Sequence, residues 1–181
     1  MLIDDFANVV VVIAHEAGHA VTAWASPMIS PPMAIRFFPL YGGAECEVVS
    51  LPEPNSTTDC LEFASLFLGG IAGETAVFGG FNRLAGNDLS LALAMAVWVR
   101  KLRGAPKRRA RRTYFLSKIH PSISRELHGF LDQSYDLAVS RVTAHKAAHD
   151  ELRNLLARGY ASGKIEWKEA ELAACLGPKP P

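Results

Sequence analysis

The sequence predicts a mainly α-helical domain with a small β-sheet, which is the α+β class. Three observations lead to this prediction. Apolar residues recur at helical spacing near the start of the chain, and further long apolar stretches follow. Between the first two stretches, residues 34–49 are interrupted by Gly42-Gly43 in the manner of two strands and a turn. The 181 residues, 49% of them hydrophobic, suffice for one domain with a sizeable core.

The first helix is predicted over residues 5–25. Asp4 or Asp5 can serve as its N-cap, and a Ser-Pro pair ends it, because proline disfavours a helical conformation in the residue before it. The apolar residues that follow the i, i+3, i+4, i+7 pattern are Phe6, Val9, Val10, Ile13, Ala17, Ala20, Val21 and Trp24. This stripe would face the core, which leaves His15 and His19 on its flank.

A small sheet is predicted at residues 34–49, and a second helix at residues 60–78. This helix is mostly apolar and should therefore be central in the fold. Thr58 or Asp59 is its expected N-cap, and a Gly-Gly pair closes it. A third helix is predicted over residues 88–102, after which a Gly-Ala-Pro run breaks the pattern.

Helices are also predicted for the rest of the chain, residues 122–176, near 122–157 and 167–176. Residues 177–181 contain three prolines and are expected to form a frayed tail. Together these elements indicate a single domain over residues 1–176.

Charge is unevenly distributed, although the formal net charge is only +1. Residues 1–88 hold ten acids and two bases, whereas residues 89–125 hold ten bases and no acid. The bases concentrate in the basic segment, residues 100–112, which could contact an acidic partner, a nucleic acid or an anionic membrane surface. A solvated surface that complements the acidic half is the plainer interpretation. The sequence has neither an aromatic-rich platform nor zinc-finger spacing, which argues against a nucleic-acid partner.

Two features concern the location of the protein. No apolar run approaches the roughly 20 residues that cross a bilayer, so no transmembrane segment is expected. The three cysteines, Cys46, Cys60 and Cys175, are widely spaced and odd in number, which is typical of a reduced protein. We therefore expect a cytoplasmic protein.

The most informative stretch is His15-Glu16-Ala17-Gly18-His19. On a helix, histidines four residues apart project from the same face, where two imidazoles can hold Zn²⁺. The adjacent Glu16 is the residue type that a zinc hydrolase uses as general base. The stretch therefore indicates metal-assisted peptide hydrolysis. The plain alternative is a pair of histidines on a helix flank beside an unrelated glutamate.

A catalytic zinc usually has three protein ligands and one position for water, so a third ligand must come from elsewhere. The nearest later histidine, His120, is distant in sequence. Two acidic positions stand out instead: Glu74 in a glycine-rich apolar stretch, and Asp88, which could equally be an ordinary helix cap. His145 and His149 repeat the four-residue spacing, but they lack an adjacent glutamate and are expected to face solvent.

These stretches resemble the FtsH-type zinc peptidase family, and they occur in the same order along the chain. Residues 15–20 resemble that family's zinc helix, residues 71–79 its Arg-Ala-Ala-Glu-Glu-Leu-Ile-Phe-Gly segment, and Asn87-Asp88-Leu89 with Ala92 the segment that carries its third zinc ligand. Residues 34–39 with Gly42-Gly43 and the helical pattern of residues 127–176 are also similar. The resemblance covers most of the chain and implies a zincin-like helical peptidase domain.

Position by position, the resemblance assigns zinc ligation to His15, His19 and Asp88, and the role of catalytic base to Glu16. The sequence departs from the family at Leu93, where the family usually has threonine. The family also carries an AAA ATPase domain, but this sequence has no phosphate loop of the Gly-x-x-x-x-Gly-Lys-Ser/Thr type. ATP-driven unfolding would therefore require a separate AAA ATPase partner.

Other residues are expected to support the site. Glu74 and Asn87 would have structural roles or hold the ligands in place, Glu74 by orienting a zinc histidine. Gly18 would leave space beside the metal or the substrate. An extended polypeptide substrate would pair with the sheet edge near Ile35 and Phe37 by strand addition.

The sequence thus predicts a zinc metalloendopeptidase that cleaves unfolded or extended polypeptides. Two alternatives stay open: a peptidase-like module that binds zinc or a partner without cleaving, and a peptidase that depends on a separate ATPase. The resemblance also implies self-association into a ring. An intact Glu16 favours activity, because a purely structural zinc needs no base.

Overall fold

The computed structural model describes residues 6–40, 42–49, 51–80, 86–104 and 121–180. In chain order the elements are α1 (Phe6–Ala25), β1 (Ala34–Phe38), β2 (Gly43–Glu47), α2 (Thr57–Phe78), α3 (Gly86–Leu102), α4 (Pro121–Ala144), α5 (Lys146–Ala161), β3 (Glu166–Lys168) and α6 (Glu169–Leu176). Six helices and a three-stranded antiparallel sheet in the described residues confirm the predicted α+β class.

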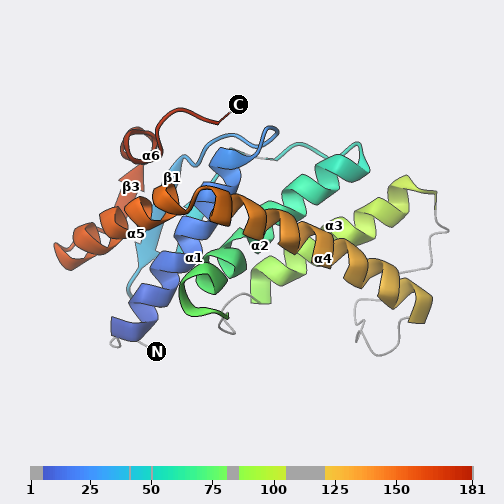
Figure 1. Ribbon diagram of the computed structural model, residues 1–181, viewed down its shortest axis with the longest axis horizontal. Coiled ribbons are helices and arrows are strands. Elements are labelled where there is room, and N and C mark those ends of the chain that lie inside the picture. The colour runs from blue at the N-terminus through green and yellow to red at the C-terminus, as the bar shows by residue number, and fades with distance from the viewer. Residues whose placement is uncertain (1–5, 41, 50, 81–85, 105–120, 181) are drawn as a thin grey trace.

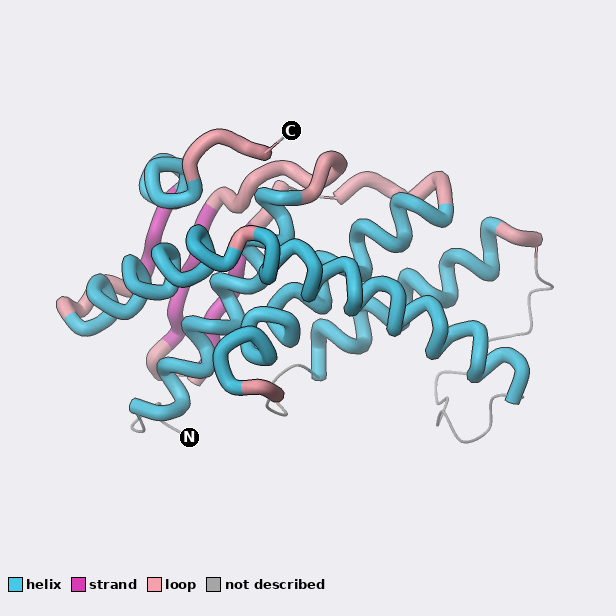
Figure 2. The backbone as a smooth tube through the Cα atoms, in the orientation of Figure 1, coloured by secondary structure: helices cyan, strands magenta, loops and turns pink. Residues whose placement is uncertain are grey.

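Helix α1 lies between the two halves of the molecule (Figure 1). One side of α1 packs on the sheet, α5 and α6, in a core cluster that includes Ile35, Leu152 and Leu172. Its other side crosses α2, which is covered in turn by α3 and α4 in a second cluster. Figure 2 shows the sheet near one end of the molecule and α3 toward the other. The crossing of α1 and α2 is therefore the middle of the fold, and the two histidines of the motif lie on it.

Helix α2 begins earlier than predicted, and its N-cap differs from the one expected. Ser56 is the N-cap: its Oγ accepts a hydrogen bond from the backbone N–H of Asp59 at 3.0 Å. The Asp59 carboxylate accepts in return from the backbone N–H of Ser56 at 3.1 Å, which completes a capping box. The prediction of Thr58 or Asp59 as cap is therefore wrong, because Asp59 occupies the third helical position of the box. Gly79, with φ of 72°, ends the helix.

The sheet contains a strand that the sequence did not predict. Its order is β2-β1-β3, so β1 is the central strand and β3 comes from a segment predicted to be helical. Trp167 lies on β3, 1% exposed, while Lys168 beside it is exposed. This alternation suits a strand, and α6 begins only at Glu169. The predicted helix over residues 167–176 is therefore wrong in its first two residues.

The tail is held more firmly than predicted. The indole N–H of Trp24 donates to the carbonyl of Gly177 at 3.2 Å. The ammonium of Lys179 donates to the carbonyl of Ile29 at 2.7 Å. The expectation of a frayed tail is therefore wrong for residues 177–180, which lie against the end of α1 and the loop that follows it; residue 181 lies outside the described residues.

Helices α1 and α2 approach each other without intervening side chains. A Cβ added at Gly18 would lie 2.2 Å from the carbonyl oxygen of Gly69, and one added at Gly73 would lie 2.3 Å from that of Ala14. Both positions therefore require glycine for close backbone contact. The predicted reason for Gly18 is wrong, because this residue faces the backbone of α2 and makes no space for a metal or a substrate.

By length and composition alone, α2 could cross a membrane, and it is the single such helix among the described residues. In the folded chain 67% of its apolar window is buried against other elements, and core helices of globular proteins meet the same criterion. The expectation that the chain lacks a transmembrane segment stays a prediction.

The described part of the basic segment lies near acidic side chains. Arg103 Nη1 is 3.0 Å from Glu126 Oε1, and Arg100 Nε is 3.8 Å from Glu126 Oε2. Lys101 Nζ is 3.9 Å from Glu53 Oε1. These contacts agree with a solvated surface that complements acidic residues. Residues 105–112 of the segment lie outside the described residues, and a partner for the segment stays a prediction.

The close helix approach predicts that Gly18→Ala destabilises the protein. The added methyl group must push α1 from α2, and we expect the free energy of unfolding to fall by about 3 kcal/mol. Urea denaturation followed by circular dichroism measures this change. Gly129→Ala on α4 is the matched control, because its Cβ would meet open space and alanine favours a helix by up to about 1 kcal/mol. Equal stability of the two variants would contradict the observed packing.

Candidate metal centre

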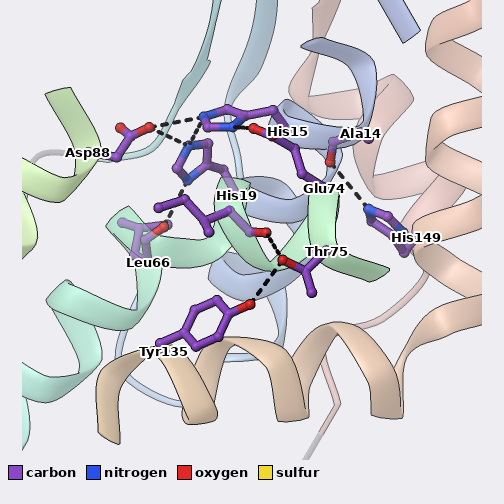
Figure 3. A network of polar contacts seen from close by, with 10 residues as sticks. Ala14, His15, His19, Leu66, Glu74, Thr75, Asp88, Tyr135 and His149 are labelled. Atoms are coloured by element: carbon purple, nitrogen blue, oxygen red, sulfur yellow. Dashed lines mark hydrogen bonds and ion pairs between the residues drawn. The ribbon is translucent and has the colours of Figure 1, made fainter. Parts of the chain in front are cut away.

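Three potential metal-ligating atoms from two helices converge on one point (Figure 3). His15 and His19 are one turn apart on α1, and Asp88 lies in the first turn of α3. His15 Nε2 is 3.0 Å from Asp88 Oδ2 and 3.0 Å from His19 Nε2. His19 Nε2 is 3.5 Å from Asp88 Oδ2. The structure thus brings together all three residues that were predicted as ligands.

Hydrogen-bond acceptors on α2 set the tautomers of both histidines. His19 Nδ1 lies 2.8 Å from the carbonyl oxygen of Leu66, which can only accept, so the proton of the neutral ring is on Nδ1. His15 Nδ1 lies 2.6 Å from Glu74 Oε1 and donates in the same way. In the neutral rings both Nε2 atoms then present lone pairs toward Asp88. Three acceptors that face one another require a proton or a cation between them.

The spacing of these atoms is compatible with a tetrahedral metal ion, of which zinc is one example. Tetrahedral zinc with ligands at about 2.0–2.1 Å places neighbouring ligand atoms roughly 3.3 Å apart. The three separations observed here are 3.0, 3.0 and 3.5 Å. Two imidazoles and one carboxylate are also the donor types that zinc accepts.

The electrostatics of the site favour a positive charge at this point. Burial lowers the pKa of His15, but hydrogen bonds to Asp88 and Glu74 outweigh that effect and raise it to about 10. Burial raises the pKa of Asp88, but hydrogen bonds from His15 and His19 outweigh burial and hold this pKa well below its usual range. The carboxylates that favour a proton on the imidazole also favour a divalent cation bound to it.

Glu16 is a buried carboxylate with an unsatisfied oxygen. It is 5% exposed, and its Oε2 makes no hydrogen bond to the described residues. Burial raises the pKa of Glu16, while the neighbouring His19 and His15 partly oppose that rise. A buried acceptor without a partner costs stability and suits a proton acceptor whose partner arrives with a substrate or a water.

A cleft of about 360 Å³ opens beside the three donors. Its walls come from α1, β2 with its flanking residues, α2 and α3, and the apolar part of its lining consists of Val12, Ala44, Val48, Leu66, Phe67 and Leu91. Glu16 and Asp88 border the same space. The cleft is thus large enough for several atoms of an extended chain, with the metal-ligating atoms and the buried carboxylate in its wall.

The remaining predicted site residues fall in different places. Glu74 is 1% exposed and contacts His15, which is the contact predicted for it. Asn87 is exposed and lines the cleft. Ile35 and Phe37, by contrast, are 0% and 1% exposed in the core.

The predicted substrate strand is wrong. Ile35 and Phe37 belong to β1, which is flanked by β2 on one side and β3 on the other. A strand with neighbours on both sides has no free edge for strand addition. The strand that borders the cleft is β2, and β2 is an outer strand of the described sheet.

Sequence reasoning missed two supports of the site. One is the carbonyl of Leu66, which no side-chain pattern can reveal. The other is Gly70, where an added Cβ would lie 2.4 Å from His15 Nε2. A glycine inside a helix costs stability, so the Gly69-Gly70 pair in α2 was a usable signal of close approach.

The second histidine pair forms no comparable group. His149 was expected to face solvent, but it is 1% exposed, with Nε2 3.4 Å from the carbonyl of Ala14. Its partner in spacing, His145, stacks edge-on against Trp24 at a centroid distance of 5.0 Å. Among the described residues, the His15, His19 and Asp88 group is the one set of three that could hold a metal.

The fold and the site together define an α+β protein with a candidate three-ligand metal centre in a cleft. Neither a scan against protein-family models nor a search of curated proteins gives a match for this chain. The resemblance to FtsH-type peptidases therefore rests on the residues quoted above and stays a proposal.

The donor geometry predicts one tightly bound Zn²⁺ per chain. His19→Ala and Asp88→Ala each remove one ligand atom, and we expect either change to weaken zinc binding by at least about 100-fold. Competition with a chromophoric chelator measures the affinity. His128→Ala, which changes an exposed histidine on α4, is the control and should bind zinc as the parent does. Unchanged affinity in both ligand variants would rule out this centre.

The hydrogen bond to His15 predicts a smaller effect for Glu74→Gln. Loss of the carboxylate charge behind a ligand should weaken zinc binding by about 10- to 100-fold and leave the stoichiometry at one. Tyr135→Phe is a matched control: it removes a 2.9 Å hydrogen bond to Thr75, next to Glu74, and should leave the affinity unchanged. Similar losses in both variants would indicate a general loosening of α2.

Proposed function

We propose that this protein is a zinc-dependent endopeptidase of the FtsH type that hydrolyses peptide bonds in extended polypeptides. One observation carries the proposal: three donors with zinc-like spacing and a buried, partly unsatisfied Glu16 border the same cleft. The order of the sequence motifs supports the same family.

In this proposal His15, His19 and Asp88 hold the metal. Glu74 keeps the ring of His15 in the tautomer that offers Nε2, and the carbonyl of Leu66 does the same for His19. Bound Zn²⁺ would supply Lewis-acid chemistry, by polarising the scissile carbonyl and making water acidic near neutral pH.

Glu16 is the proposed general base. Its free Oε2 can accept a proton from the attacking water. The proton then passes to the nitrogen of the leaving amine. Burial keeps the carboxylate away from bulk water, so the protons that it can accept come from molecules in the cleft.

The substrate would lie along β2. This strand supplies residues 43–46 to the cleft wall and has its open side there. Strand addition uses backbone hydrogen bonds, which any sequence except proline can provide. An extended or unfolded polypeptide is therefore the fitting substrate class.

A silent zinc-binding module is the main rival. Structural zinc sites are usually closed by four protein ligands, whereas catalytic sites have three and an open position. The described residues supply three, beside a cleft. This count, with the unsatisfied Glu16, supports activity over silent binding. An ATPase partner, self-association and a cytoplasmic location stay predictions.

Degradation of a reduced and alkylated, unfolded protein without ATP tests the proposal. The zinc-loaded parent should cleave it, and Glu16→Gln should be slower by about 10²- to 10⁴-fold, because a general base contributes that much. Zinc content must be the same in both. Glu53→Gln, which changes an exposed loop carboxylate, is the control and should cleave as the parent does.

Each outcome separates the candidates. Loss of cleavage in Glu16→Gln alone supports an autonomous peptidase. Equal cleavage by the two proteins would exclude Glu16 as the base. No cleavage by either, with one zinc bound, would favour the binding module or the ATPase-dependent peptidase; adding candidate ATPases would then separate these two.

A further inference from the structure

The open edge of the sheet borders the metal centre. Within the described sheet, β2 pairs with β1 alone, and residues 42–46 line the cleft that also holds Glu16 and Asp88. An edge strand presents unpaired backbone N–H and C=O groups, which are a template for another extended chain. The site is therefore bounded by a surface that can align a polypeptide in one register.

The direction of the free backbone groups follows from the register. The N–H of Phe37 donates to the carbonyl of Ile165 at 2.8 Å, on the β3 side of β1. Backbone groups alternate sides along a strand, so those of Arg36 point toward β2, where Glu45 is the directly opposite residue. Glu45 thus turns its backbone groups toward β1, and the residues on either side of it turn theirs to the open edge.

Beside this edge the outer face of the sheet carries excess negative charge. Arg36 Nη1 is 3.2 Å from Glu45 and 2.5 Å from Glu47, and Arg36 Nε is 2.7 Å from Glu166. One guanidinium therefore faces three carboxylates. Of the three, Glu45 has the longest contact and the most exposed side chain, at 52%. Glu45 is consequently the carboxylate best placed to accept a second cation.

An independent observation points to a ligand in the same cleft. Glu16 lines this space and is more than nine-tenths buried, and its Oε2 has no partner among the described residues. A group that arrives from solvent along β2 would therefore meet both an unsatisfied carboxylate oxygen and an unpaired strand edge.

We propose that the open edge of β2 selects polypeptides that carry lysine or arginine at the residue facing Glu45. The inference rests on the proposed function. Directly opposite residues of antiparallel strands share one face of the sheet, so the facing residue extends its side chain on the outer face beside Glu45. Its two neighbours point the other way, toward the side where Ala44 and Cys46 lie with the apolar core. The preferred substrate is thus apolar, basic and apolar at three successive positions.

Charged residues on an edge strand also discourage edge-to-edge aggregation. Protection against aggregation requires charge at the edge, but it does not make one position of a bound polypeptide prefer a cation. A positional charge preference therefore distinguishes recognition from protection.

The test uses the full-length, zinc-loaded protein and short fluorogenic peptides of one apolar sequence. Lysine, glutamine or glutamate is placed in turn at each position, and kcat/KM is measured for every peptide. At one position we expect the lysine peptide to be cleaved about 5- to 10-fold faster than the glutamate peptide, because the exposed ion pair of the first is replaced by a repulsion of similar size in the second. Added salt should reduce this ratio. Binding of the same peptides to Glu16→Gln, followed by fluorescence anisotropy, gives a readout independent of cleavage.

Two variants test whether Glu45 causes the preference for lysine over glutamate. Glu45→Gln should reduce the lysine-to-glutamate ratio below about 2, since the facing charge is gone. Glu166→Gln is the matched control: Glu166 also lies opposite Arg36 and pairs with it, but it is on β3, beyond β1 from the cleft. The ratio should persist in that variant.

The outcomes distinguish the two proposals. Cleavage with a ratio near 1 at every position overturns the inference and leaves the endopeptidase intact. Equal loss of the ratio in Glu45→Gln and Glu166→Gln also overturns it, because overall charge would then be the cause. Selective binding without cleavage by the parent supports the edge preference and overturns the endopeptidase. Neither binding nor cleavage of any peptide overturns both.

Discussion

The close approach of α1 and α2 is the constraint on which the rest of this structure depends. At Gly18 and Gly73 the two backbones pack without side chains between them, so the turn of α1 that carries both histidines lies directly on α2. That contact lets α2 offer Leu66 and Glu74 to the two Nδ1 atoms. The orientation of the proposed ligands is therefore a property of helix packing, and a change that separates the helices moves both imidazoles together.

Three carboxylates, those of Glu16, Glu74 and Asp88, lie around the two imidazoles, and each has different contacts. Glu74 is buried and committed to His15, and Asp88 is held ionised by both histidines. Glu16 has an oxygen with no partner among the described residues, together with a raised pKa. Glu16 and Asp88 thus differ in their tendency to ionise and in their availability because their surroundings differ, which is the arrangement that general acid–base chemistry requires.

The sequence predicted those parts of the fold whose signals are local. The apolar stripe and the Ser-Pro stop predicted α1 to its last residue, Ala25, and the glycine after α2 marked its end. The strand at Trp167 could not be predicted, because three residues give no reliable period and the strand exists through pairing with β1, far away in sequence. The errors at Ile35 and Phe37 have the same origin, since strand order is a non-local property. Motif spacing suggested His15 and His19 as metal ligands, and the family resemblance suggested Asp88, but only the fold could show Asp88 beside His15, 73 residues away.

The position of β3 has a consequence for biosynthesis. Strand β1 finds its first neighbour, β2, within a short hairpin, but its second neighbour consists of residues 166–168. While the chain is being made, the backbone N–H and C=O groups on the β3 side of β1 therefore stay unpaired until residues 166–168 have left the ribosome. An unpaired strand edge is a site of misassociation. Strand β3, although only three residues long, thus covers the open edge of β1 and prevents that edge from pairing with other chains.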